Sequence, residues 1–159
     1  MFNTHANRAC LLLFYLCSAA NARSAVSIVH TIAQGLPSAD SAWQLREKHS
    51  ERYGDGSVHA DIEWTNGATK LGATVIVHRT LTSARHAFRP DGKDDPHESF
   101  RVSGIGDEAF LWPPIVLTGG AYNLRFREGR TEVWISAASQ AEIERIAGII
   151  AGAVSSGSD

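Results

Sequence analysis

The chain has 159 residues, with 15 Lys and Arg against 17 Asp and Glu, and a formal net charge of −2. This balance excludes the strongly basic surface that binds nucleic acid or an anionic membrane. With 43% hydrophobic and 20% charged residues, the composition is typical of one globular domain rather than of a disordered chain.

The first 22 residues have the pattern of an export signal. Arg8 precedes an apolar run over residues 9–17, which is too short to span a bilayer, and Ala20 and Ala22 form a small-residue cleavage site. We therefore expect a signal peptide over residues 1–22 and export of the protein to the periplasm or the cell exterior.

Both cysteines, Cys10 and Cys17, lie within this signal, so the mature chain can form no disulfide. The alternative is a lipoprotein acylated at Cys17, which the bulky residues 14–16 disfavour. Past the signal we expect a single domain over residues 23–154 and a flexible tail over residues 155–159.

The first part of the mature chain has ambiguous patterns. Residues 25–33 are apolar without a clear period, so they could form a first strand or a short helix that ends at residues 35–37. Residues 38–53 predict a polar, largely exposed helix, because Ser38 can cap its start and Gly54 follows its end.

Two runs of alternating apolar residues separated by Asn66-Gly67 predict a β-hairpin. The apolar positions are Val58, Ala60, Ile62 and Trp64 in the first run and Leu71, Ala73, Val75 and Val77 in the second. Since alternate side chains of a strand point to opposite faces, the polar residues between them lie on the outer face of this hairpin.

A metal site is one hypothesis for that outer face. With a loop of about five residues, His59 and His78 would face each other, and with Asp61 or Glu63 they could hold zinc or copper. A tight turn would instead pair His59 with Thr74. Because no recognised metal-ligand spacing is present, we expect two ordinary surface histidines and no metal or other cofactor.

The next elements continue the alternation of helix and strand. Residues 82–88 predict a short helix, and residues 89–99 predict a surface loop because they are polar and contain two prolines. Residues 108–112 predict a strand, and residues 120–127 and 131–137 predict a second hairpin.

The last helix, predicted over residues 139–154, has the clearest signal. Ser139 and Glu142 form a capping box in front of apolar residues at helical spacing. We expect Gly148 and Gly152 to allow close packing of this helix on the sheet. Together these elements predict the α+β class, with a mainly antiparallel sheet of about five or six strands and helices packed on it.

A glycine-rich turn precedes the 108–112 strand. Gly104 and Gly106 permit positive φ, and Asp107 can bond local amides, so we interpret these three residues as a structural turn. Gly104, Gly106 and Ala109 also match a dinucleotide fingerprint, but a proline pair follows too soon for the helix that this fingerprint needs. Asp107 and Glu108 are adjacent on an extended chain and should point to opposite faces, which disfavours a paired-carboxylate mechanism.

A family resemblance rests on this turn. The stretch Gly104-Ile-Gly-Asp-Glu-Ala-Phe110, the hairpin strand around residues 122–129 and the Ala- and Ile-rich last helix resemble uncharacterised bacterial secreted and lipoprotein domains with a Gly-x-Gly-Asp-Glu-Ala signature. Those domains are similar, at fold level, to the PsbP/Mog1-like α/β/α sandwich. The resemblance covers roughly residues 73–154 and implies a fold but no catalytic residues.

One apolar segment is a candidate contact site. Residues 111–117 carry no charge, and two prolines stop the strand from continuing into the sheet. We expect Trp112, Pro113, Pro114 and Ile115 to contact a protein partner or a small apolar ligand. The alternative is that this segment folds back onto the core.

The sequence has no nucleophile elbow and no mature cysteine nucleophile. We therefore expect a non-catalytic binding or accessory module, a monomer or weak homodimer that neither binds nucleic acid nor spans a membrane. The alternative is a small periplasmic hydrolase or metal-dependent enzyme. A binding module should have an apolar groove in which no titratable groups with shifted pKa values converge, whereas an enzyme should have both the groove and such groups.

Overall fold

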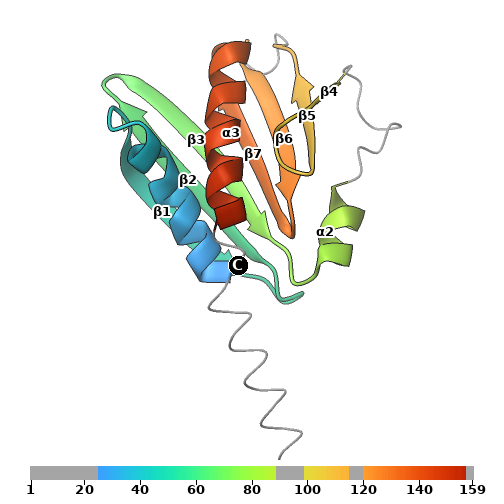
Figure 1. Ribbon diagram of the computed structural model, residues 1–159. Coiled ribbons are helices and arrows are strands. Elements are labelled where there is room, and N and C mark those ends of the chain that lie inside the picture. The colour runs from blue at the N-terminus through green and yellow to red at the C-terminus, as the bar shows by residue number, and fades with distance from the viewer. Residues whose placement is uncertain (1–24, 89–98, 115–119, 157–159) are drawn as a thin grey trace, which may run out of the picture.

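The computed structural model describes residues 25–88, 99–114 and 120–156, and these residues build one antiparallel sheet with helices packed against it (Figure 1). The sheet has seven strands in the order β1-β2-β3-β7-β6-β5-β4. Its strands are β1 (Gln44–Arg52), β2 (Val58–Asn66), β3 (Thr69–Val77), β4 (Phe100–Val102), β5 (Glu108–Trp112), β6 (Tyr122–Glu128) and β7 (Thr131–Ala137). The predicted α+β class and antiparallel sheet are confirmed, although the sheet is larger than the five or six strands expected.

The core lies between one face of this sheet and two helices. The helix of residues 25–39 and α3 (Gln140–Ser156) lie side by side across that face (Figure 1). Each contributes buried apolar side chains at helical spacing, and the alternate apolar positions of the strands face them. Fully buried examples are Ile32, Leu36, Trp64, Val75, Phe126, Ile143, Ile146 and Ile150.

The first helix resolves the ambiguity over residues 25–33 and continues through the expected stop at Gly35 and Pro37. Pro37 has no N–H to donate to the carbonyl oxygen of Ala33. The indole Nε1 of Trp64 donates to that oxygen instead, at 2.9 Å. A side chain of β2 therefore satisfies the carbonyl that the proline leaves unpaired, which offsets part of the cost of a proline inside a helix.

The prediction of a helix over residues 38–53 is wrong. Residues 44–52 form β1, an edge strand that pairs along its length with β2. Its side chains are almost all exposed, so no buried face imposes an alternating apolar pattern on the sequence. The charged residues of β1 are typical of edge strands, which they protect against pairing with other chains.

The predicted hairpins and the short helix are confirmed. In the first hairpin Gly67, with φ +59°, and Ala68 form the turn, and His59 pairs with Ile76 rather than with position 78 or 74. The second hairpin is β6–β7. The short helix is α2 (Leu81–Ala87), which begins with a capping box between Thr80 and Ser83.

One of the two hydrogen bonds of the predicted capping box is present in the last helix, because the Glu142 amide donates to Ser139 Oγ at 3.3 Å. It runs to Ser156, so two of the residues assigned to the tail continue the helix. Gly148 and Gly152 face solvent, which corrects the expectation that they pack on the sheet. No helix in the described part of the chain is long and apolar enough to cross a membrane.

Three predictions concern segments outside the described residues. The signal peptide of residues 1–22 and most of the loop over residues 89–99 belong to these segments, as do residues 157–159 of the tail.

Candidate functional site

The sheet face opposite the two long helices, here called the open face, carries most of the polar side chains of the strands. Antiparallel pairing places them in rows that cross the sheet. One row is His49, Asp61, Thr74, Trp134, Arg125 and Phe110. A neighbouring row contains Glu47, Glu63 and Gly72 on β1 to β3, and Ser136, Asn123 and Trp112 on β7 to β5.

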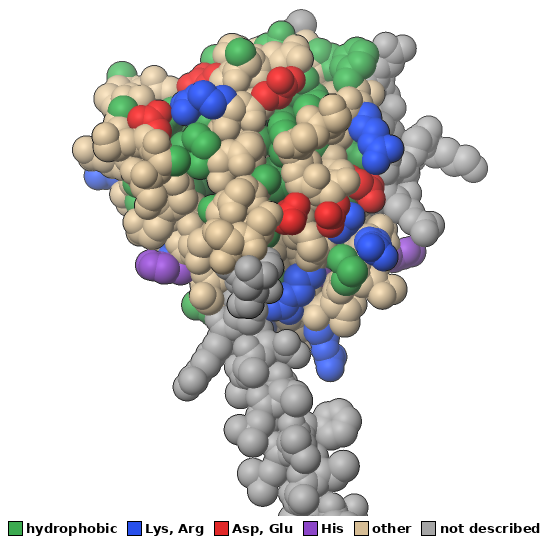
Figure 2. Space-filling view, viewed as in Figure 1, with side chains coloured by type: hydrophobic (Ala, Val, Ile, Leu, Met, Phe, Trp, Pro, Cys, Tyr) green, Lys and Arg blue, Asp and Glu red, His purple; other side chains and the backbone are tan. Residues whose placement is uncertain are grey.

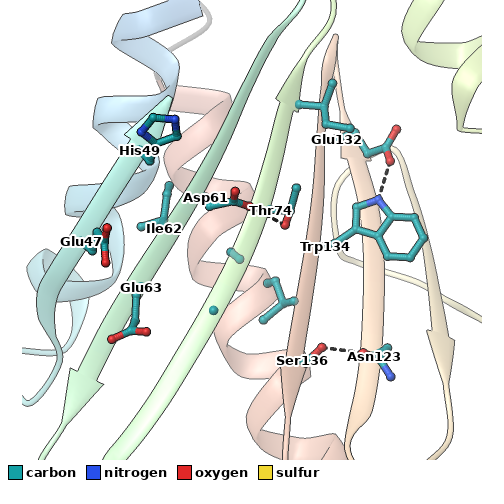
Figure 3. A pocket seen from close by; sticks show the side chains of 14 residues that line it. Glu47, His49, Asp61, Ile62, Glu63, Thr74, Asn123, Glu132, Trp134 and Ser136 are labelled. Atoms are coloured by element: carbon teal, nitrogen blue, oxygen red, sulfur yellow. Dashed lines mark hydrogen bonds between the residues drawn. The ribbon is translucent and has the colours of Figure 1, made fainter. Parts of the chain in front are cut away.

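A hollow of about 840 Å³ lies between these rows (Figure 3). It is lined by Glu47 and His49 of β1, Asp61, Ile62 and Glu63 of β2, Gly72, Ala73, Thr74 and Ile76 of β3, Asn123 of β6, and Glu132, Trp134, Ile135 and Ser136 of β7. The charged side chains of this lining are acidic, apart from His49. On the helix-covered face, acidic and basic side chains are interspersed (Figure 2).

Gly72 explains why the sheet is hollow here. A Cβ on this residue would meet no atom within 4 Å, and its strand pairs with β2 in continuous register without a bulge. A glycine inside a strand weakens it, and apart from bulges and bends it marks a place where a ligand or another backbone comes close. Since neither neighbouring packing nor a positive φ requires Gly72, the missing side chain adds open space to the hollow.

Trp134 forms the wall of the hollow on β7 and is held in place by its neighbours. Its Nε1 donates to Glu132 Oε1 at 2.5 Å. The guanidinium carbon of Arg125 lies 4.7 Å from the centre of the Trp134 ring. Trp134 remains 41% exposed, and Figure 3 shows its ring on the open face of the sheet. Trp134 is thus a fixed aromatic surface that a ligand can contact.

Glu132 is the buried centre of this arrangement, with 3% of its side chain exposed. Its Oε1 also accepts from Arg125 Nε at 2.8 Å, and its Oε2 lies 3.5 Å from His78 Nε2. Burial alone would raise the pKa of Glu132, but hydrogen bonds from His78, Arg125 and Trp134 lower it to about 2. The Glu132 carboxylate therefore stays ionised at neutral pH and positions Trp134. An ionised carboxylate has no proton to give, so Glu132 does not suit the role of a general acid.

An aromatic cluster connects Trp134 to α2. The indole of Trp112 lies parallel to that of Trp134, with centroids 6.1 Å apart, and Phe110 lies 6.4 Å from Trp112 and 5.9 Å from Phe88. Arg125 lies against Phe88 as well, at 4.8 Å, and its Nη2 donates to the Ala87 carbonyl at 2.9 Å. This short helix therefore packs on the open-face side, next to the hollow.

The expected contact segment is only partly described. Trp112 and Pro113 are half-buried, Pro114 is exposed, and Ile115 lies outside the described residues. The Trp112 side chain belongs to the aromatic cluster rather than to an isolated apolar loop. It lies beside a hollow lined by carboxylates, and contact of this segment with a protein partner or an apolar ligand stays a prediction.

The glycine turn fastens β5 to the β6–β7 hairpin. Gly104 and Gly106 have φ of +82° and +56°. Asp107 bonds distant groups rather than the local amides expected, because its Oδ2 accepts from Arg127 Nη1 at 2.6 Å and from the Gly129 amide at 3.0 Å. Glu108 Oε1 accepts from the same guanidinium at 3.3 Å. The two adjacent carboxylates therefore point to one group, which corrects the expectation that they face opposite ways, but that group is a structural arginine.

The two histidines of the metal hypothesis do not pair across the hairpin, because His59 lies opposite Ile76. The His59 ring lies against that of Tyr53, with centroids 4.1 Å apart and a tilt of 37°, whereas His78 follows β3 and faces Glu132. Within the described residues no group of three or more His, Cys, Asp or Glu side chains is arranged to hold a metal ion.

One Asp-Ser-His arrangement does occur, in the turn between β1 and β2. Ser57 Oγ lies 2.7 Å from Asp55 Oδ1, to which it donates, and 3.1 Å from His59 Nε2. The side chain and amide of Ser57 lower the pKa of Asp55 by hydrogen bonding. A catalytic triad needs the histidine between the serine and the carboxylate. Here the buried Ser57 hydroxyl binds the carboxylate itself, so the arrangement stabilises the turn.

The sequence analysis does not predict most residues of the hollow, although the sequence contains a signal for two of them. Trp134 stands between two inward-facing residues of β7, and because side chains alternate along a strand, Trp134 must point outward. Gly72 takes an outward position within an alternating run, with no turn directly after it. What the sequence lacks is the pairing of β3 with β7, which brings Asp61 and Thr74 to Trp134.

Comparisons with protein-family models, curated proteins and solved structures find no match to this chain.

Proposed function

We propose that this chain is an exported, non-catalytic binding module whose ligand occupies the hollow on the open face. The observation that carries the proposal is Gly72, whose absent side chain leaves the hollow open although the surrounding structure would accommodate a Cβ. The fixed and exposed Trp134 beside it supports the proposal, because rigid aromatic side chains often dominate binding energy. A PsbP/Mog1-like relationship is part of the same proposal and is supported by the antiparallel sheet with its helices.

The occupant that the lining favours is a polar ligand rather than an apolar one. Carboxylate, hydroxyl and amide groups surround Trp134, including Asp61, Thr74, Ser136 and Asn123. Mixed lining of this kind, with an aromatic surface and a few polar groups, is typical of small-molecule sites.

The test fills the hollow. Gly72→Phe places a large side chain there, and Gly148→Phe adds the same side chain at an exposed glycine of α3 as the matched control. Isotope-labelled protein is mixed with fractions of a periplasmic or extracellular extract, and backbone amide shifts are followed by NMR. We expect one fraction to move the amides of Asp61, Thr74 and Trp134 in the wild type and the control but not in Gly72→Phe. Equal shifts in all three proteins, or none on the open face, would contradict the proposal.

Export has its own test. Mass spectrometry of the secreted protein should give a chain that begins at Arg23, because Ala20 and Ala22 define the cleavage site. An uncleaved chain retained in the cytoplasm would disprove export.

A further inference from the structure

The two sides of the hollow differ in chemistry. On the β1–β2 side, Glu47, Asp61 and Glu63 offer hydrogen-bond acceptors. On the β7 side, Trp134 offers an aromatic surface that continues into the parallel indole of Trp112. A ligand that uses both sides therefore needs donor groups at one end and an apolar face at the other.

The carboxylates on the β1–β2 side are incompletely compensated. Glu47 pairs directly across from Glu63, an arrangement of like charges that destabilises a free sheet. Lys70 reaches Glu63 at 3.3 Å but is itself 71% exposed, and Asp61 accepts from Thr74 Oγ1 at 2.9 Å. Among the described residues that line the hollow there is no Lys or Arg, so an anionic ligand is disfavoured.

The aromatic side disfavours a cation. Arg125 already lies against the Trp134 ring at 4.7 Å and has its charge partner in Glu132. A second cation on the same indole would be repelled by this guanidinium. A neutral ligand has no such cost.

We propose that the hollow binds a neutral carbohydrate chain, an inference that rests on the proposed function. One face of a pyranose ring presents C–H groups that stack on an indole, and its hydroxyl groups donate hydrogen bonds to carboxylates. The hollow extends from β1 and β2 across β3 to β7, so Asp61 and Trp134 stand on strands about 10 Å apart. This span suits more than one sugar ring.

Calorimetric titration with neutral oligosaccharides tests the inference. The probes are hexamers of β-1,4-linked glucose, α-1,4-linked glucose and β-1,4-linked N-acetylglucosamine, with spermine and hexalysine as cationic comparisons. We expect at least one sugar to bind, Trp134→Ala to weaken its binding about tenfold or more, and Trp134→Phe to restore part of it. Tyr53→Ala, at an exposed aromatic residue beyond the hollow, serves as the control and should change nothing.

The response to salt separates the two ligand classes. Sugar binding should change little between about 50 mM and about 500 mM salt, whereas binding of a cation to these carboxylates should weaken. If no hexamer binds, or if only the cationic probes do, the carbohydrate inference is wrong. The effect of Gly72→Phe on the extract fractions then still decides the proposed function independently.

Discussion

A Cβ placed on Gly106 would lie 2.5 Å from the carbonyl oxygen of Arg127. That oxygen accepts a hydrogen bond from the Asp107 amide at 2.8 Å, so it cannot move aside without loosening the turn from the β6–β7 hairpin. Gly106 also adopts a φ of +56°, a region that costs other residues about 1–2 kcal/mol. Two separate effects thus require glycine at this position.

Gly106→Ala should therefore destabilise the protein by about 2–5 kcal/mol, from backbone strain and overpacking together. Gly104→Ala is the matched control, because Gly104 has a φ of +82° but open space around its Cβ position. We expect the control to cost only about 1–2 kcal/mol. Urea denaturation of both variants measures the difference, and equal costs would show that the contact with Arg127 is unimportant.

The stability of the protein should depend on pH through Glu132. Because the pKa of this carboxyl lies at about 2 in the folded state, below its ordinary value of 4.5, its contribution is present above pH 4.5 and is lost as the pH falls toward 2. The difference corresponds to roughly 3 kcal/mol. His78 and Arg125 face this carboxylate directly, and the cross-strand neighbour Arg127 is paired with Asp107.

Glu132→Gln separates this effect from general acid unfolding. The variant should be less stable than the wild type at neutral pH, and the difference should shrink as the pH falls from about 4.5 to about 2. Denaturant midpoints at several pH values within this window provide the measurement. A difference that stays constant over the window would mean that the charge of Glu132 does not stabilise the fold.

The sequence predicts those elements that bury one face. β2, β3 and β7 alternate because their inward residues meet the helices, and α3 is recognisable from its cap and its helical spacing. β1 escapes prediction because it buries almost nothing, and the first helix is obscured by Gly35 and Pro37. For this helix the decisive contact is Trp64 Nε1 to Ala33, which joins residues 31 positions apart.

The site is less predictable than the fold for a related reason. Its centre joins His78, Arg125, Glu132 and Trp134, which meet only because β7 inserts between β3 and β6. Alternation shows that Glu132 and Trp134 share one face of the sheet and that Val133 points to the other face. It does not reveal which strands flank β7. Strand order follows from the packing of the whole chain.

Trp112 should behave as a surface aromatic residue with partial burial. Trp112→Ala should cost about 1–2 kcal/mol, because the side chain is only half-buried and its aromatic contacts add a modest amount. Trp64→Ala is the comparison, since Trp64 is fully buried and bonded to Ala33, and it should cost about 3–5 kcal/mol. If thermal or urea unfolding gives the same loss for both, Trp112 is part of the core, as in the alternative interpretation of its segment.

The two long helices are in close contact at Gly35, where a Cβ would lie 2.8 Å from the Cβ of Ala153. Alanine favours a helix over glycine by about 1 kcal/mol when the site is exposed. At Gly35 the added methyl group must push the helices apart, so Gly35→Ala should destabilise the protein by about 1–3 kcal/mol although alanine has the better helix propensity.

The control is Gly148→Ala, on the solvent side of α3 with nothing near its Cβ position, which should instead stabilise the protein by about 0.5–1 kcal/mol. Opposite signs in urea denaturation would support close packing at Gly35, whereas stabilisation by both substitutions would show that the helices accommodate a methyl group there.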